Sequence, residues 1–120
     1  MSISDSNLSV ATGQVHRPAE KFVLPSGSEV WNFDIAVREE GLRQDTFTIA
    51  WHGDASVVER LEPGDRVLVR GRTQRRWRQA GGTRISTTEL VASAVVSLRS
   101  TKRVQQQLRL ASDELTDLAG

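Results

Sequence analysis

Arginine is concentrated in one stretch of the chain that contains no acidic residue. Residues 66–88 hold seven of the fourteen arginines, and six of these are candidate phosphate ligands: Arg70, Arg72, Arg75, Arg76, Arg78 and Arg84. The planar guanidinium group can contact phosphate through two hydrogen bonds and also stacks on flat rings. A dense arginine block is equally typical of a solvated strand face. The functional interpretation is that these arginines form a positively charged surface that binds nucleic acid.

Trp77 lies inside this block, in the run Arg75-Arg76-Trp77-Arg78. A tryptophan flanked by arginines is poorly suited to a hydrophobic core, so we expect its ring to be exposed. Proteins that bind single strands without sequence preference combine a cationic groove with aromatic rings on which bases stack. Trp77 and the arginines around it predict such a surface, and an ordinary surface or interface tryptophan is the alternative.

The remaining chemistry of the sequence argues against an enzyme. The chain has no cysteine and only two histidines, so we expect no metal site and no cofactor. It has no acidic pair at catalytic spacing, no nucleophile motif and no phosphate-binding loop, so we expect no catalytic residue. No apolar run reaches the roughly 20 residues of a membrane helix, and the polar N-terminus lacks a secretory signal. These features predict a cytoplasmic protein with no membrane contact.

The elements that must position these residues are strands. Apolar and polar residues alternate in five segments, which we predict to be the main strands: residues 8–16, 29–38, 45–51, 66–78 and 84–98. Residues 22–24 are a candidate short edge strand, because Pro18 argues against continuing the first strand. Residues 54–61 have apolar positions at helical spacing after Asp54, which predicts a short helix. The turn of the last hairpin falls at residues 79–83.

Five strands with internal glycines, and one short helix between the third and fourth, predict an all-β fold in which a bent sheet closes into a barrel. This is the element order of the OB-fold, the oligonucleotide/oligosaccharide-binding fold. We expect the barrel domain at residues 8–98, a disordered lead at residues 1–7 and a C-terminal tail at residues 99–120. Apolar residues at steps of three and four make the tail a possible helix: Val104, Leu108, Ala111, Leu115 and Leu118. Its basic start and acidic end oppose the helix dipole, so a frayed tail and a helix docked on a neighbouring subunit or partner both remain open.

Several segments, taken in order, resemble the bacterial single-stranded DNA-binding protein family over residues 8–98. The segments that carry the resemblance are Gly13, Pro25-Ser26-Gly27, Trp51-His52-Gly53, Pro63-Gly64-Asp65-Arg66-Val67, Gly71-Arg72 and Arg75-Arg76-Trp77. The resemblance implies a homotetramer that binds single-stranded DNA in replication, repair or recombination, near the nucleoid. It also implies that Trp51 and Trp77 stack on bases. Phe47 alternates on the same strand face as Trp51 and is a third candidate for stacking, with burial in the core as the alternative.

Two departures from the family limit what the resemblance implies. The loop at residues 39–44 lacks the stacking tryptophan that members often carry there, and the chain ends without an acidic tip. Recruitment of protein partners through such a tip is therefore not expected. Trp31 has no stacking counterpart, and we expect it in the core or at a subunit interface. The alternative functions are a primosome-type OB-fold accessory protein that acts mainly through protein contacts, and a barrel that binds oligosaccharide or protein.

Overall fold

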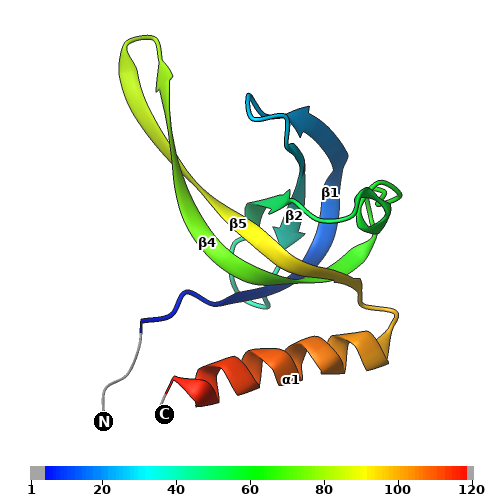
Figure 1. The fold of residues 1–120 in the computed structure, drawn as a ribbon. Coiled ribbons are helices and arrows are strands. Elements are labelled where there is room, and N and C mark those ends of the chain that lie inside the picture. Colours follow the sequence, from blue (N-terminus) through cyan, green and yellow to red (C-terminus); the bar gives the residue numbers. More distant parts are fainter. Residues whose placement is uncertain (1–4, 119–120) are drawn as a thin grey trace.

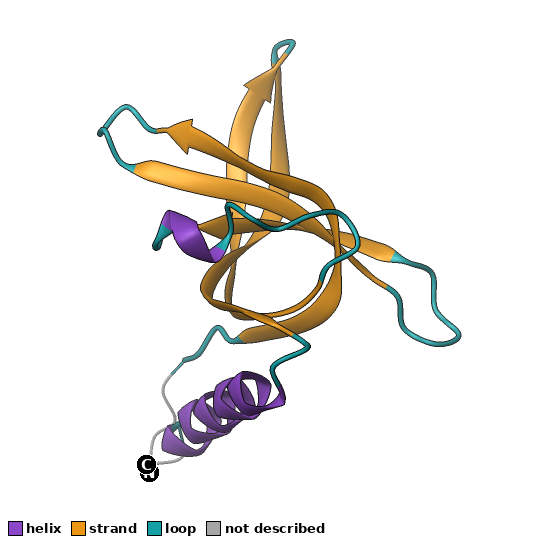
Figure 2. Ribbon diagram, turned by 90° about the vertical axis from the view of Figure 1, so that its right-hand side faces the viewer, coloured by secondary structure: helices purple, strands orange, loops and turns teal. Residues whose placement is uncertain are grey.

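The computed structural model describes residues 5–118 and contains five strands, one short 3-10 helix and one C-terminal α-helix (Figure 1, Figure 2). In chain order these elements are β1 (Ser9–Val23), β2 (Glu29–Val37), β3 (Asp45–Trp51), η1 (Ala55–Val57), β4 (Arg66–Ala80), β5 (Thr83–Ser97) and α1 (Thr101–Asp117). The predicted all-β class, with a possible C-terminal helix, is confirmed.

The five strands close into a ring in the order β1-β2-β3-β5-β4. All neighbouring strands are antiparallel except β3 and β5, which run parallel. The ring closes because β1 pairs with both β2 and β4, so that Ser9 lies opposite Gly71 and Gln14 lies opposite Arg66. A five-stranded ring with this element order is consistent with the predicted OB-fold.

The core lies inside the ring and is built from alternate residues of every strand, as the pleat of a strand requires. Its members are Val15, Phe33, Ile35, Ile49, Val58, Val67, Val69, Leu90 and Val95, all of them buried. Trp31, Val37, Trp51 and Leu61 pack against this cluster from its margins. The aliphatic side chains thus fill the ring, while two of the three tryptophans lie at its edge.

The first strand corrects the prediction of two separate segments. β1 continues through Pro18 to Val23, and its pairing with β2 shifts register between Val15 and Arg17 and again between Arg17 and Glu20. Proline has no N–H to donate to the hydrogen-bond ladder. A strand can therefore contain a proline where bulges already interrupt its pairing with the neighbouring strand. The proline therefore bends this strand without ending it.

The predicted helix at residues 54–61 is also corrected, because only Ala55–Val57 is helical and forms a single 3-10 turn. Asp54 caps this turn as expected, and its side chain accepts a hydrogen bond from the Ser56 amide at 2.9 Å. The chain then turns inward and buries Val58 completely. Two successive β-branched residues, Val57 and Val58, disfavour continuation of a helix.

β4 and β5 form a hairpin that extends beyond the ring on the side away from α1 (Figure 1). Its turn contains Gly81 and Gly82, which both have positive φ. Where β4 leaves the ring, the pairing shifts register between Arg70 and Gly71, and a Cβ atom at Gly71 would overlap the Val91 carbonyl oxygen. Only glycine therefore allows the two strands to approach closely at the base of this hairpin.

α1 begins after Ser100, whose hydroxyl accepts a hydrogen bond from the Arg103 amide, and it packs on β4 and β5 of its own barrel. The structure therefore docks the tail as an ordered helix within the chain. At the other terminus, residues 1–4 of the expected disordered lead lie outside the described residues. Asn7, the last residue of that lead, is held by the barrel, because its side-chain amide donates to the Thr73 carbonyl at 2.7 Å and its Oδ1 accepts from the Thr73 amide at 3.1 Å.

Candidate nucleic-acid interface

The indole ring of Trp77 is half exposed on the β4–β5 hairpin and lies between two arginines. The guanidinium carbon of Arg84 is 4.4 Å from the ring centroid, and that of Arg75 is 5.7 Å from it. A cation over an aromatic face is attracted by the negative potential of the ring. The predicted exposure of Trp77 is thus observed, and the arginines hold positive charge directly beside its stacking surface.

The hairpin arginines divide between its two faces. Thr73 lies opposite the core residue Leu90, so the odd-numbered positions of β4 continue the inner face of the ring into the hairpin. Arg75 and Trp77 lie on that face. Arg72, Arg76 and Arg78 lie on the opposite face, which continues the outer surface of the sheet. The structure therefore brings only Arg75 and Arg84, of the six candidate phosphate ligands, together with Trp77.

Trp51 is partly buried at the end of β3 and is fixed by its surroundings. Its indole N–H donates to the Asp54 carbonyl at 2.8 Å, and its ring lies so close to Gly53 that any side chain there would contact it. Trp31 lies opposite Trp51 on β2, and both rings pack against the core. Trp51 thus offers a rigid ring edge at the same end of the ring as the base of the hairpin.

Phe47, the third candidate for stacking, lies near the start of β3. It lies four residues before Trp51 on β3, about 13 Å along the strand. It borders a cavity of about 540 Å³ together with Val10, Leu68 and Leu108. The parallel register of β3 and β5 continues from Thr48 opposite Glu89 to Phe47 beside Thr88, which is the partner of Arg75 on the hairpin. Its ring is exposed, as a stacking residue requires, so Phe47 is a candidate for the part of the interface beside Arg75.

Arg70 is separated from the hairpin arginines. Its Nε–H donates to Oε1 of Gln107 on α1 at 2.7 Å, and the residue borders a cavity with Asp113, Glu114 and Asp117. A guanidinium group that is held by the helix and shares a cavity with three carboxylates is poorly placed to bind a phosphate. The structure therefore gives Arg70 a contact that fixes α1 on the barrel.

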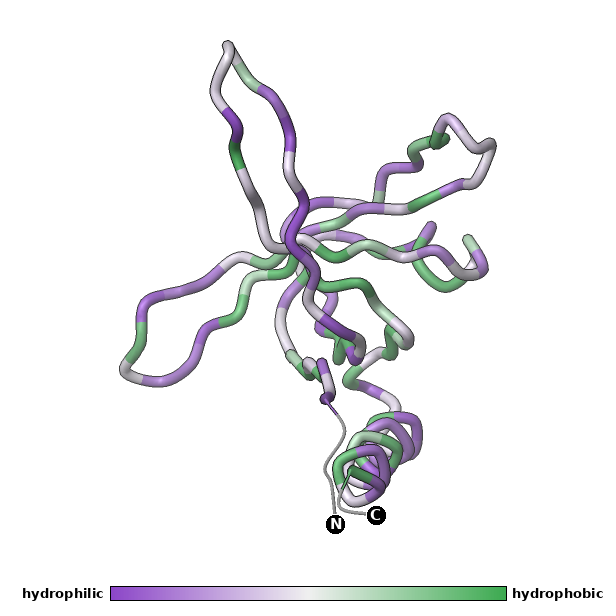
Figure 3. The backbone as a smooth tube through the Cα atoms, turned by 60° about the vertical axis from the view of Figure 1, so that its left-hand side comes forward, coloured by the Kyte–Doolittle hydropathy of each residue, from purple (hydrophilic) through white to green (hydrophobic). Residues whose placement is uncertain are grey.

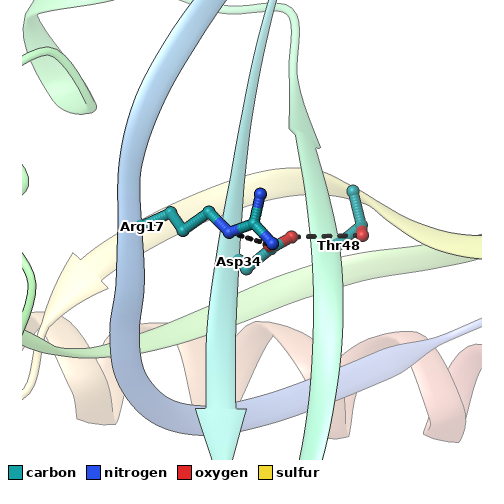
Figure 4. Close-up of polar contacts among 3 residues, drawn as sticks. All are labelled: Arg17, Asp34 and Thr48. Carbon is teal, nitrogen blue, oxygen red and sulfur yellow. Dashed lines mark hydrogen bonds and ion pairs between the residues drawn. The ribbon is translucent and has the colours of Figure 1, made fainter.

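A polar row that the sequence reasoning missed crosses the outer surface of the sheet. Arg17 and Asp34 form an ion pair at 3.5 Å, and the Thr48 hydroxyl donates to the same carboxylate at 3.2 Å (Figure 4). Thr48 in turn lies opposite Glu89, which is 6% exposed and pairs with Arg76 at 3.7 Å. The only signal in the sequence was the polar residues at alternate strand positions. This alternation predicts that their side chains face outward, but it does not predict which of them contact one another.

The polar row gives the outer surface of β2, β3 and β5 two carboxylates, and each already has an arginine partner. The paired charges cancel, so this surface attracts a phosphate backbone less than the hairpin, where Arg72, Arg75, Arg78 and Arg84 form no ion pair within residues 5–118. Beside Trp51, hydrogen bonds from the Ser56 amide and hydroxyl lower the pKa of the Asp54 carboxyl. Asp54 therefore carries its negative charge throughout the neutral range, at the edge of the candidate interface.

Within residues 5–118, no group of three or more histidine, cysteine, aspartate or glutamate side chains is arranged to hold a metal ion. In the same part of the chain, no helix is both long enough and apolar enough to cross a membrane. The features that stand out in this structure are therefore the exposed, arginine-flanked tryptophan on a projecting hairpin and the barrel that supports it.

Comparison with known proteins agrees with this geometry. The model of the Single-strand binding protein family matches residues 7–98. A search among curated proteins finds no match. Among solved structures, the chain is similar to a Plasmodium falciparum SSB in complex with ssDNA, with a TM-score of 0.69 and 21% sequence identity. The similarity covers 82% of this chain and 99% of that one, and at this identity it concerns the fold.

Proposed function

The chain belongs to the single-strand binding protein family, and from this premise we propose that it binds single-stranded DNA without sequence preference, by base stacking and phosphate contacts. The observation that carries the proposal is Trp77, a half-exposed indole between two arginines on a hairpin that projects from the barrel. Every base has a flat face, so stacking on such a ring tolerates any sequence, and each stacked base contributes about 1–3 kcal/mol.

The binding surface that we propose is centred on the hairpin and the adjoining end of the ring. Trp77 and Trp51 are its stacking residues. Arg75 and Arg84 contact phosphates beside Trp77, and Arg72 and Arg78 contact them from the outer face. Arg76 contributes less, because the buried carboxylate of Glu89 already neutralises it. Phe47 is a third stacking candidate, because the strand register sets it beside Thr88, the partner of Arg75. Arg70 is left out of this surface because Gln107 of α1 holds its guanidinium group.

In the cell we propose a non-catalytic role, in which the protein coats single strands during replication, repair or recombination. On the same family premise we propose a homo-oligomer, a tetramer if it follows the resemblance, located in the cytoplasm at the nucleoid. The support for assembly on this chain is its exposed apolar residues, among them Val10, Phe47, Leu108 and Leu115. Such residues gain stability when a second chain covers them.

A fluorescence titration with oligo-dT tests the proposal. We expect saturable quenching of tryptophan emission by the single strand, no comparable response to a duplex of the same length, and similar affinity for a mixed-sequence strand. The affinity should fall steeply with added salt, because each phosphate contact on a single strand contributes about 0.7 to the slope of log affinity against log salt concentration. Equal binding to duplex, or affinity independent of salt, would contradict the proposal.

A further inference from the structure

The β4–β5 hairpin is joined to the barrel at its base. β4 pairs with β1 from Arg66 opposite Gln14 to Gly71 opposite Ser9, and beyond that point it continues with β5 as its partner. Trp77 lies six residues beyond Gly71, about 20 Å along the strand. Figure 3 shows the hairpin, at the top of the view, standing clear of the rest of the backbone. Two strands alone are marginally stable in water, so the contacts at the base determine where this hairpin points.

Asn7 supplies one of the contacts at this base. Its side-chain amide donates to the Thr73 carbonyl at 2.7 Å, and its Oδ1 accepts from the Thr73 amide at 3.1 Å and from the Thr73 hydroxyl at 3.2 Å. The antiparallel register of β1 and β4, continued from Ser9 opposite Gly71, sets position 7 opposite position 73. The carboxamide of Asn7 therefore takes the place of a backbone amide in the next rung of the ladder. Among the described residues, nothing in β4 beyond Thr73 is hydrogen-bonded to β1 or to the segment that precedes it.

Thr73 lies between a bend in β4 and the stacking ring. On one side, the pairing of β4 with β5 shifts register between Arg70 and Gly71, and a bulge of this kind bends the strand. On the other side, Trp77 lies four residues further along, on the same face of β4. A rotation of about 10° at the bend would move the ring by about 3.5 Å, which is the spacing of stacked bases. The hydrogen bonds that hold Thr73 therefore also hold the place of Trp77.

The contact between Asn7 and Thr73 acts locally. Asn7 is exposed and is not a member of the core cluster, so its side chain fills no core volume. Its three hydrogen bonds all involve Thr73, which lies 66 positions away in the sequence. Water can replace exposed hydrogen bonds when they break, so they contribute little to the free energy of unfolding. What the contact changes is the freedom of the hairpin to move against the barrel.

We propose that Asn7 is a positioning residue for base stacking. By holding Thr73, it sets the angle of the hairpin at which Trp77 and Trp51 can stack on the same strand of DNA. Asn7 acts through Trp77 and contacts no base itself. This inference rests on the proposed binding of single-stranded DNA, whereas the fastening of the hairpin by Asn7 exists without DNA, so the two are tested separately.

Amide hydrogen exchange of the free protein tests the fastening. In Asn7→Ala, exchange at the Thr73 amide and at the hairpin amides of residues 74–88 should be at least about tenfold faster, while the core amides of β2 and β3 keep their rates. Gln14→Ala is the matched control, because Gln14 is an exposed amide side chain of β1 that donates to the Gly64 carbonyl at 3.4 Å, away from the hairpin. Unchanged hairpin exchange in Asn7→Ala overturns the proposal. Faster exchange throughout the barrel also overturns it, because Asn7 would then be a general structural residue.

A double-mutant cycle with oligo-dT tests whether Asn7 acts through Trp77. Asn7→Ala should weaken binding at least about threefold in the otherwise wild-type protein and leave it unchanged in Trp77→Ala, because no ring then remains to be positioned. Gln14→Ala should bind as the wild type does. If the wild type binds, losses that add in the double variant, or full affinity of Asn7→Ala, overturn the role of Asn7 alone. A wild type that does not bind oligo-dT contradicts the proposed function itself, and the stacking role of Asn7 falls with it.

Discussion

At the scale of single residues, Trp77 meets two requirements that oppose each other. A stacking ring must be open to solvent, yet an indole on a projecting hairpin has no core to hold its orientation. The guanidinium carbon of Arg84 lies 4.4 Å from the centroid of the indole ring. This cation–π contact holds the orientation of the ring, and the guanidinium group itself stays solvated. The ring is therefore oriented in advance, and a base that stacks on it has positive charge close by.

Trp77→Ala should weaken oligo-dT binding by about 1–3 kcal/mol, because it removes one stacking surface. The free energy of unfolding should hardly change, since the ring is half exposed and fills no core volume. A titration followed by anisotropy of labelled oligo-dT, together with urea unfolding, measures both quantities. If the variant loses stability and keeps its affinity, the ring is a structural residue.

Arg75→Ala with Arg78→Ala should weaken binding to dT and to mixed-sequence strands about equally, because phosphate contacts carry no sequence information. The salt dependence should also flatten, with the slope falling by about 0.7 for each lost phosphate contact. Arg70→Ala is the matched control, since Arg70 is engaged by Gln107 under α1. A slope that changes in the control and not in the hairpin variant would place the DNA on the helix side of the barrel.

At the scale of elements, local pattern predicted the strands that alternate cleanly and failed where two effects compete. The alternation of β2 and β3 and the glycine turn of the last hairpin were visible in the sequence, and the structure confirms them. The continuation of β1 through Pro18 was not visible, because the two bulges that accommodate the proline are properties of the pairing with β2. The length of the helix after Asp54 was overestimated for a similar reason. The segment has apolar residues at helical spacing, but Val58 leaves the helix and is buried inside the ring.

The candidate site could be predicted only in part, because alternation shows which residues share a face but does not show which face binds. The sequence pattern does not distinguish Arg70, Arg72 and Arg76. In the structure, Arg70 donates a hydrogen bond to Gln107 on α1, and Arg76 forms an ion pair with Glu89. Glu89 lies seventeen positions from Arg72 and thirteen from Arg76, so only the hairpin register brings it to the latter. Phe47 and Trp51 share a strand face, but Trp51 lies opposite Ala92 and Phe47 lies four residues nearer the hairpin turn.

Gly71→Ala should destabilise the barrel by about 1–3 kcal/mol, the usual cost of an added methyl group that has no space. The new Cβ would overlap the Val91 carbonyl oxygen, so β4 and β5 must separate at the base of the hairpin. Urea unfolding measures the change. Gly81→Asn is the control, because Gly81 has a φ of 58° and asparagine tolerates that left-handed conformation better than most residues. Equal stability of the alanine variant and the wild type would contradict the argument.

At the scale of the whole molecule, the two ends of the barrel have different surroundings. The hairpin carries an exposed tryptophan between two arginines, and α1 packs on β4 and β5 on the other side of the barrel (Figure 1). Leu68 shows that this cover matters, because it points away from the core between Val67 and Val69 and is nevertheless only 1% exposed. The surface proposed for DNA and the surface that α1 covers are therefore separate.

Removal of residues 101–120 should leave a folded barrel that binds a short oligo-dT with nearly the affinity of the full chain. Its melting temperature should fall, because Leu68 loses its cover and Arg70 loses Gln107. Assembly, measured by sedimentation, and cooperative binding to long strands should change more than short-strand affinity. A tenfold loss of short-strand affinity with an unchanged mass would instead assign Lys102, Arg103 and Arg109 to DNA contact.

The closure of the ring also determines the order in which the strands can pair during folding. β4 and β5 are joined by a tight turn and can pair as soon as both exist, whereas β1 finds its second neighbour only in β4, and β3 finds its second neighbour only in β5. Pairs that are distant along the chain form late, because the entropy of the intervening loop must be lost first. During synthesis, β1, β2 and β3 therefore wait with open edges until more than two thirds of the chain has left the ribosome. The edge of β1 is the part of the nascent protein most exposed to wrong pairing.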